Sequence, residues 1–143
     1  MTTRQAVIAD LMACLAGITS ANGFAVVPKK LRRGIHLASQ ASETPALSLF
    51  NERVETIETG GETAERLLVM HLWGAAAAPG GDYAQLDLLA AACLMALARP
   101  DLNPHWQRTS VQRLEVFEGG AAEPLALFDL EFSLAYESGL GVL

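Results

Sequence analysis

The amino-acid sequence predicts an α+β domain in which two main α-helices pack on one face of a mostly antiparallel or mixed β-sheet. Three observations predict it: apolar stripes at helical spacing over residues 3–19 and 82–99, an apolar run at Leu67–Trp73, and a nearly ideal alternation of apolar and polar residues over Phe128–Tyr136. The order helix, strands, helix, hairpin is typical of this class. With 143 residues, 51% of them hydrophobic, we expect a single domain, 1–143, with one core.

The first helix is predicted over about residues 3–19, with Thr2 or Thr3 as its N-cap. Its buried stripe recurs every three or four residues and consists of Ile8, Leu11, Leu15 and Ile18, flanked by Val7 and Met12. Asn22 and Gly23 tolerate the left-handed conformation that closes a helix. A short strand over Phe24–Val27, stopped by Pro28, is expected next.

The segment after Pro28 holds four of the ten basic residues, Lys29, Lys30, Arg32 and Arg33. We interpret it as an exposed loop, and three roles are open to it. A phosphate or nucleic-acid contact is disfavoured, because no aromatic residues interleave with the charges to stack on bases. The others are a plain solvated loop and a protein–protein rim, for which arginine suits carboxylate pairing. These four residues are the candidate protein-interaction site.

An antiparallel meander is predicted in the middle of the chain. Pro45 can begin a strand without losing an interior hydrogen bond, so residues 46–52 and 53–57 are expected to be extended. The segment 58–63 indicates a turn, and Leu67–Trp73 indicates a central strand covered on both faces. A helix is the alternative for this run, but the run is short and Gly74 follows it.

Small residues over 75–81 indicate a hinge before the second helix, residues 82–99. Asp82 and Gln85 have the spacing of a capping box, and Pro100 stops the helix behind Arg99. The predicted buried stripe comprises Leu86, Leu89, Ala90, Cys93, Leu94 and Leu97.

The chain closes with a predicted hairpin of strands 110–117 and 125–136 around a turn at 118–120. In the second strand the apolar side chains Phe128, Leu130, Phe132, Leu134 and Tyr136 alternate with Asp129, Glu131 and Ser133. We therefore expect one buried face and one wet face, and the wet face also accounts for Glu115.

No residue pattern identifies a reaction, so we expect no catalytic residue, no cofactor and no metal ligand. The histidines, His36, His71 and His105, stand far apart in the sequence without a metal-binding motif. Cys14 and Cys93 fall on helical stripes, where a thiol behaves as a small hydrophobe, and a disulfide is not expected. The paired glycines do not form a phosphate-binding motif and are interpreted as turns.

Charge is divided unevenly along the chain. Residues 1–44 contain five of the ten Lys and Arg but only Asp10 and Glu43 of the sixteen acidic residues, so this segment carries +3 and the remainder −9. The division argues against a general nucleic-acid binder; it fits either two solvated surfaces or one part of a protomer meeting the opposite part of a neighbour. The N-terminus lacks the features of a signal peptide and no run is long enough to cross a membrane, so we expect a cytoplasmic protein.

The arrangement resembles the tail terminator, or tail completion, proteins of long-tailed bacteriophages and prophages. The resemblance rests on the helix opening Val7–Leu11, the strand entry Pro45–Phe50, the apolar strand Leu67–Leu72, the helix Asp82–Arg99 and the closing strand Phe128–Tyr136. These are similarities of element order and hydrophobicity, with no short motif from which binding residues carry across.

The resemblance implies a structural virion protein that forms a homo-oligomer, a hexameric ring, on the tail tube. Such a ring ends tube polymerisation and offers the surface for head joining, with the tail tube protein and a head–tail joining protein as partners. It would assemble in the bacterial host cytoplasm and end in the virion tail, without membrane or sequence-specific nucleic-acid binding. Two alternatives stay open: a head–tail adaptor, and a small enzyme or ligand-binding module around His71–Trp73 and His105–Trp106.

Overall fold

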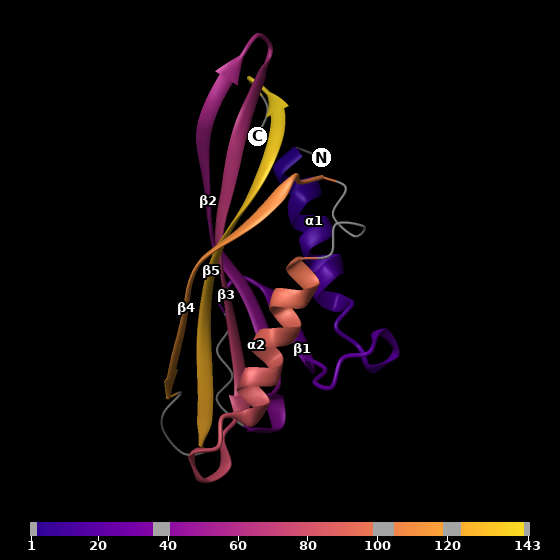
Figure 1. Cartoon of the computed structure of the whole chain (residues 1–143), viewed down its shortest axis with the longest axis vertical. Coiled ribbons are helices and arrows are strands. Elements are labelled where there is room, and N and C mark those ends of the chain that lie inside the picture. Colours follow the sequence, from indigo (N-terminus) through magenta and orange to yellow (C-terminus); the bar gives the residue numbers. More distant parts are fainter. Residues whose placement is uncertain (1–2, 36–40, 99–104, 119–123, 142–143) are drawn as a thin grey trace.

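The computed structural model describes residues 3–35, 41–98, 105–118 and 124–141. Within these residues the main elements are two α-helices and five strands: α1 (Thr3–Ala16), β1 (Lys30–Arg33), β2 (Ala46–Gly60), β3 (Thr63–Ala77), α2 (Ala84–Leu97), β4 (Arg108–Glu118) and β5 (Leu125–Gly139). The predicted α+β class is confirmed. Figure 1 shows the two helices together on one side of a strongly twisted sheet.

The strands lie in the order β1-β2-β3-β5-β4, so β3, which contains the predicted central strand, is the middle strand of five. β1 runs parallel to β2, and every other neighbouring pair is antiparallel. β2 and β3 form the predicted hairpin, but its turn is shorter than the predicted segment 58–63, because β2 runs to Gly60 and β3 begins at Thr63. β4 pairs with β5 as the expected hairpin. Its predicted turn at 118–120 lies mostly outside the described residues.

The core lies between the helices and one face of the sheet. Leu68, Met70 and Leu72 of β3 are fully buried there, together with the predicted stripe of β5 from Phe128 to Tyr136. The helices contribute their own stripes to the same cluster, including Val7, Ile8, Leu11 and Leu15 of α1 and Leu86, Leu89, Cys93 and Leu97 of α2. The two periodicities in the sequence therefore meet at one interface.

The opposite face of the sheet has no helix over it among the described residues, and we call it the bare face. We predicted that Leu67–Trp73 is covered on both faces, and this prediction is wrong for the bare face. Leu67, His71 and Trp73 point to the bare face and are half-buried, because side chains of neighbouring strands lie against them. The expected wet side of β5 is likewise only partly wet, since Ser133 is buried.

Two predictions near the N-terminus are wrong. α1 ends at Ala16, and a separate short 3-10 helix follows at Ser20–Asn22, closed by left-handed Gly23. Residues 24–27 do not form a strand. The strand in this region is β1, which lies in the basic segment that we expected to be a loop. β1 is a strand because its backbone pairs with residues 46–49 of β2, a contact that no local pattern reveals.

The second helix begins at Ala84, two residues after the predicted start at residue 82. Its N-cap is Tyr83, although Asp82 Oδ1 still accepts a hydrogen bond from the Ala84 amide at 3.0 Å. The predicted hinge is shorter than expected, because Ala75–Ala77 continue β3. Leu94 is 36% exposed instead of buried. Arg99 and Pro100 lie outside the described residues.

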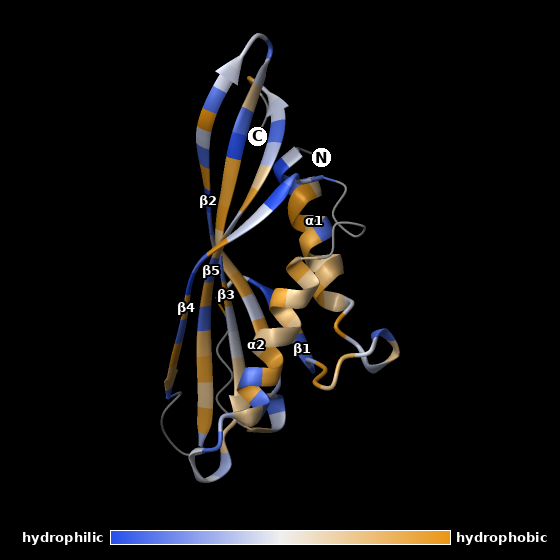
Figure 2. Cartoon of the chain, viewed as in Figure 1, coloured by the Kyte–Doolittle hydropathy of each residue, from blue (hydrophilic) through white to orange (hydrophobic). Residues whose placement is uncertain are grey.

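The β2–β3 hairpin extends past the end of α1 (Figure 1). We call this projection the arm and define it as residues 55–66, together with residues 137–139 of β5 and the following Leu140, which lie beside β3. The described side chains from Glu55 to Thr63 are all exposed, and hydrophilic positions recur along the strands here, whereas the strand segments beneath the helices are largely apolar (Figure 2). The arm is thus a sheet extension without a helix layer.

Candidate protein-interaction surface

The four predicted interaction residues lie on or beside β1, at one edge of the sheet. In a parallel pair, side chains at partnered positions share a face. Leu31 and Arg33 are partnered with buried Leu47 and Leu49, so they belong to the helix face, whereas Lys30 and Arg32 belong to the bare face. From the sequence we grouped the four cations in one site, but in the structure Arg33 lies on one face of β1 and Lys30 and Arg32 lie on the other.

Arg33 is engaged within its own chain. Its guanidinium donates to both carboxylate oxygens of Glu52, with Nη2 to Oε1 at 2.6 Å and Nε to Oε2 at 3.1 Å. Arg4 of α1 reaches the same carboxylate at 3.1 Å. This triad fastens β1 to β2 and α1, so the role of Arg33 in the structure is partly internal.

Lys29, Lys30 and Arg32 form no ion pair with the residues that the structure describes. Lys29 and Arg32 are exposed, and Lys30 is half-buried. Val27 and Ile35 flank them and are 41% and 72% exposed. We call residues 27–35 the basic edge; it combines unpaired cations with exposed apolar side chains at the end of a sheet.

At the other end of the bare face, register brings three glutamates together. Glu58 on β2 is partnered with Glu65 on β3, and Glu65 is partnered with Glu137 on β5. Directly opposed like charges destabilise a sheet. We call these three residues the acidic row. Neither Glu58 nor Glu137 has an ion pair within the described part of the chain, and Arg108 Nη1 lies 3.4 Å from Glu65 Oε1.

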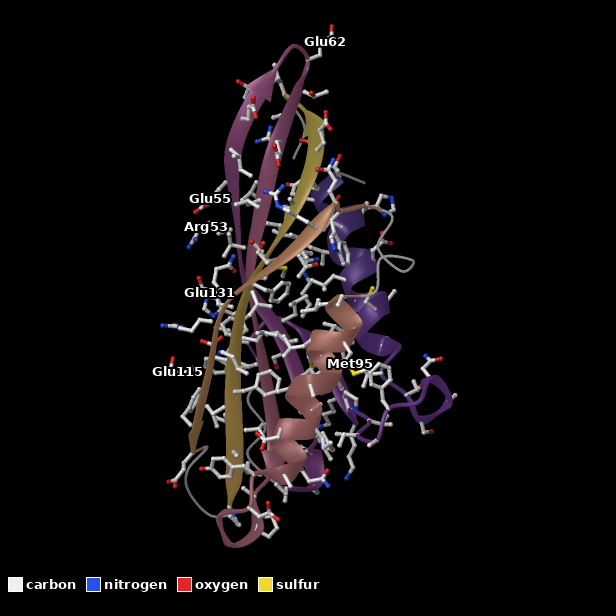
Figure 3. The ribbon with its side chains drawn as sticks, viewed as in Figure 1. Arg53, Glu55, Glu62, Met95, Glu115 and Glu131 are labelled. Atoms are coloured by element: carbon white, nitrogen blue, oxygen red, sulfur yellow. The ribbon has the colours of Figure 1, made fainter. Side chains whose placement is uncertain are left out.

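The acidic row lines a hollow on the arm. This hollow has a volume of about 210 Å³ and is lined by Glu58, Gly60, Thr63, Glu65, Gln107 and Glu137. Ile57, which is 47% exposed, lies beside it in sequence, and Glu62 marks the far tip of the hairpin (Figure 3). The arm therefore presents carboxylates and an exposed apolar side chain, the counterpart of the basic edge.

Arg66 holds the arm together from its other face. Its guanidinium is almost fully buried and donates to Thr56 Oγ1 at 2.7 Å, to Ser138 Oγ at 2.9 Å and to the Leu140 carbonyl at 3.1 Å. These acceptors lie on β2, on β5 and just beyond β5. One side chain thus ties three strand segments together where no helix covers them.

The middle of the bare face carries aromatic rings and a histidine pair. Trp73 meets Phe50 edge-on at a centroid distance of 4.8 Å and Phe117 at 6.3 Å. His71 Nδ1 lies 2.7 Å from Asp129 Oδ1, and its Nε2 lies 3.8 Å from Glu131 Oε2. Arg113 and Glu115 add further charges on this face, and Figure 3 shows Glu115, Glu131, Arg53 and Glu55 on the side away from the helices.

The remaining candidates for chemistry are dispersed. His105 pairs with Asp10 of α1, and His36 lies outside the described residues. Cys14 and Cys93 are buried and are not joined by a disulfide, and burial raises the pKa of the Cys93 thiol to about 12. Among the described residues, no group of three or more His, Cys, Asp and Glu is arranged to hold a metal ion, and no helix is long and apolar enough to cross a membrane.

A second hollow, of about 390 Å³, lies between the end of α2 and the start of β4. It is lined by Leu94, Leu97, Ala98, Trp106, Gln107, Arg108, Thr109 and Val111. Exposed apolar side chains continue from it along both elements: Leu88 and Met95 on α2, and Leu114 and Val116 on β4. Its one charged side chain, Arg108, already pairs with Glu65, so the lining offers little convergent polar chemistry.

Sequence reasoning found the basic edge but missed the acidic row. The three glutamates are 7 and 72 residues apart, and the pairing register alone unites them. The overall charge division, +3 against −9, was the available clue to an acidic counterpart. This charge division indicates that the second surface is acidic, but it does not indicate which residues form it.

Neither a protein-family model nor a curated protein sequence matches the chain. Among solved structures, the chain is similar to a component of the virion of a native gene transfer agent (GTA) particle. The two are 19% identical, with a TM-score of 0.58, and the superposition covers 96% of this chain and 92% of the other. At this identity the likeness establishes a shared fold over nearly the whole of both chains.

Proposed function

We propose that this chain is a structural virion protein that caps a phage-like tail tube as a ring, ends tube polymerisation and offers the surface for head joining. The observation that carries the proposal is the match to a virion component over nearly the full length of both chains. The element order that resembles tail terminators supports the same role from the sequence.

A structural role also agrees with what the surface offers. Charges and exposed apolar side chains gather at the two ends of the bare face, where they suit protein contacts rather than the enclosure of a small substrate. The proposed partners are further copies of the chain in a hexameric ring, the tail tube protein and a head–tail joining protein. Assembly in the host cytoplasm and residence in the virion tail belong to the same proposal.

The test combines solution mass with tube capping. Light scattering over a range of concentration and salt gives the oligomeric state, and negative-stain microscopy shows whether the chain binds the ends of purified tail tubes. Tube protein polymerising without the chain is the control. A hexamer, or a monomer that becomes a ring on tube ends, together with shorter tubes, is expected. A monomer or dimer without affinity for tube ends would refute the role, and binding to the head side only would indicate a head–tail adaptor.

A further inference from the structure

We propose that the arm of one protomer docks on the basic edge of a second copy, so that the acidic row receives Lys30 and Arg32 of its neighbour. This inference rests on the proposed function for the ring, but the contact itself is argued from the surface. Both halves of it are present on every copy, which identifies the occupant as a second copy of this chain.

Charge complementarity is the first argument. The acidic row holds three carboxylates side by side with Arg108 as the one nearby cation in the described chain, an arrangement that repels itself when it is isolated. The basic edge has the opposite imbalance, with Lys29, Lys30 and Arg32 unpaired among the described residues. Bringing the two together removes both imbalances.

Apolar complementarity accompanies the charges. Ile57 on the arm is 47% exposed, and Val27 and Ile35 on the basic edge are 41% and 72% exposed. Interfaces place apolar contacts at their centre and charged pairs around them. Each of the two surfaces combines exposed apolar side chains with charges, and the sign of the charges is opposite on the two.

One chain cannot make this contact with itself. Lys30 and Arg32 are partnered with Ala46 and Ser48, near the start of β2, whereas Glu58 lies near its end. Ten residues of strand separate Ser48 from Glu58, which is about 33 Å at about 3.3 Å per residue. Figure 1 shows the same separation, with the arm at one end of the molecule and β1 well away from it. The contact therefore joins different copies.

The contact is between two different patches. Repeated around an axis it closes a ring, and made twice between two copies it gives a two-fold pair. The hollow of about 210 Å³ on the arm is large enough for the end of a lysine or arginine side chain.

The test is a charge exchange between the two surfaces. The edge variant is Lys30→Glu with Arg32→Glu, and the arm variant is Glu58→Lys with Glu137→Lys. Each variant alone is expected to raise the dissociation constant of self-association about ten-fold or more, since like charges then oppose one another. An equimolar mixture of the two is expected to restore assembly, because each variant supplies the charge that the other lost.

A matched control changes charge elsewhere. Asp87→Lys with Glu118→Lys shifts net charge as much as the arm variant does, at two exposed positions outside both surfaces. This control should assemble as the unaltered chain does. Circular dichroism verifies that all variants fold, and each mass measurement is made with and without purified tail tubes.

The outcomes separate the contact from the function. Loss in each variant with recovery in the mixture supports the contact, and a recovered dimer supports it while refuting the ring. Unchanged assembly of both variants, loss in the control, or no recovery in the mixture overturns it. A chain that stays monomeric at every concentration, with and without tubes, also overturns it. Normal capping of tubes by both variants would leave the proposed function standing without this contact.

Discussion

The guanidinium of Arg66 on β3 donates a hydrogen bond of 2.9 Å to the hydroxyl of Ser138 on β5, across a part of the sheet that no described helix covers. Its other bonds, to Thr56 Oγ1 and the Leu140 carbonyl, make Arg66 the anchor of the arm. In the arm, hydrogen bonds from this buried cation hold the strands together, whereas apolar packing against the helices does so in the rest of the fold.

Arg66→Met should loosen the arm without unfolding the core. The substitution leaves the acceptors of three hydrogen bonds without their charged donor, and a bond to a charged group contributes about 1.5–3 kcal/mol. The same substitution removes the cost of burying the guanidinium, so the net loss is well below that of three full bonds. We expect the free energy of unfolding to fall by about 2 kcal/mol in urea titrations, with faster hydrogen exchange over residues 55–66. Arg53→Met is the control, because Arg53 is exposed and bonds only to Glu55 among the described residues. Equal loss in both variants would contradict the anchor.

Gly74→Ala should destabilise the protein through a clash. Gly74 is partnered with Phe128 on β5, and a Cβ built on it would overlap the Phe128 ring. Overpacking of this kind costs about 1–3 kcal/mol, occasionally more. The double variant Gly74→Ala with Phe128→Leu should be more stable to thermal unfolding than the sum of the single changes predicts. Strict additivity would show that the ring and the glycine are independent.

Leu130→Asp should unfold the domain. Leu130 is fully buried in the core, so the change removes apolar packing and buries an unpaired charge, against a total stability of about 5–15 kcal/mol. Leu114 is its cross-strand partner on β4 and is 43% exposed, which makes Leu114→Asp a matched control. Circular dichroism should show an unfolded chain for the first and a folded one for the second. A folded Leu130→Asp would place the core elsewhere.

Stability should fall in alkaline solution through Cys93. Burial raises the pKa of this thiol from 9.0 to about 12, so the unfolded state loses its proton first as pH rises. The stabilising contribution is complete below pH 9 and is lost between pH 9 and about 12, with a slope approaching about 1.4 kcal/mol per pH unit.

The measurement is the difference in urea midpoint between the unaltered chain and Cys93→Ala over pH 8 to pH 10.5. A difference is needed because burial also raises the pKa of Tyr136, which adds a slope of the same sign to both proteins. The substituted chain should lose less stability with rising pH. Parallel curves for the two proteins would show that the Cys93 thiol titrates normally.

Local pattern predicted the parts of the fold that bury a regular stripe. The stripes of α2 and β5 were visible because each repeats over several turns or pleats, and both elements form in the structure. From the sequence we placed the end of the strand at Gly74, whereas β3 continues to Ala77. Gly74 leaves space for the Phe128 ring, and this contact between two strands is not visible in the local sequence.

Of the two proposed interaction surfaces, only the residues of the basic edge could be predicted from the sequence. Lys29, Lys30, Arg32 and Arg33 stand together in sequence, so their charge was obvious, but the strand state of β1 depends on parallel pairing and on the Arg33–Glu52 pair. The acidic row depends wholly on the register of three long strands. Interaction surfaces built across a sheet are therefore harder to read from a sequence than those built along one segment.

The reach of the arm can change only in discrete steps. Side chains alternate between faces along the regularly paired stretches of β2 and β3, and β2 departs from this register at Phe50–Arg53 and at Thr56–Glu58. Lengthening both strands by one residue within a regular stretch would therefore turn the tip over and move Glu58 to the other face of the sheet. Lengthening both by two residues keeps every side chain on its face and extends the projection by about 7 Å. Relatives of this chain that keep the same two register shifts and span wider or narrower gaps should therefore differ in hairpin length by even numbers of residues per strand.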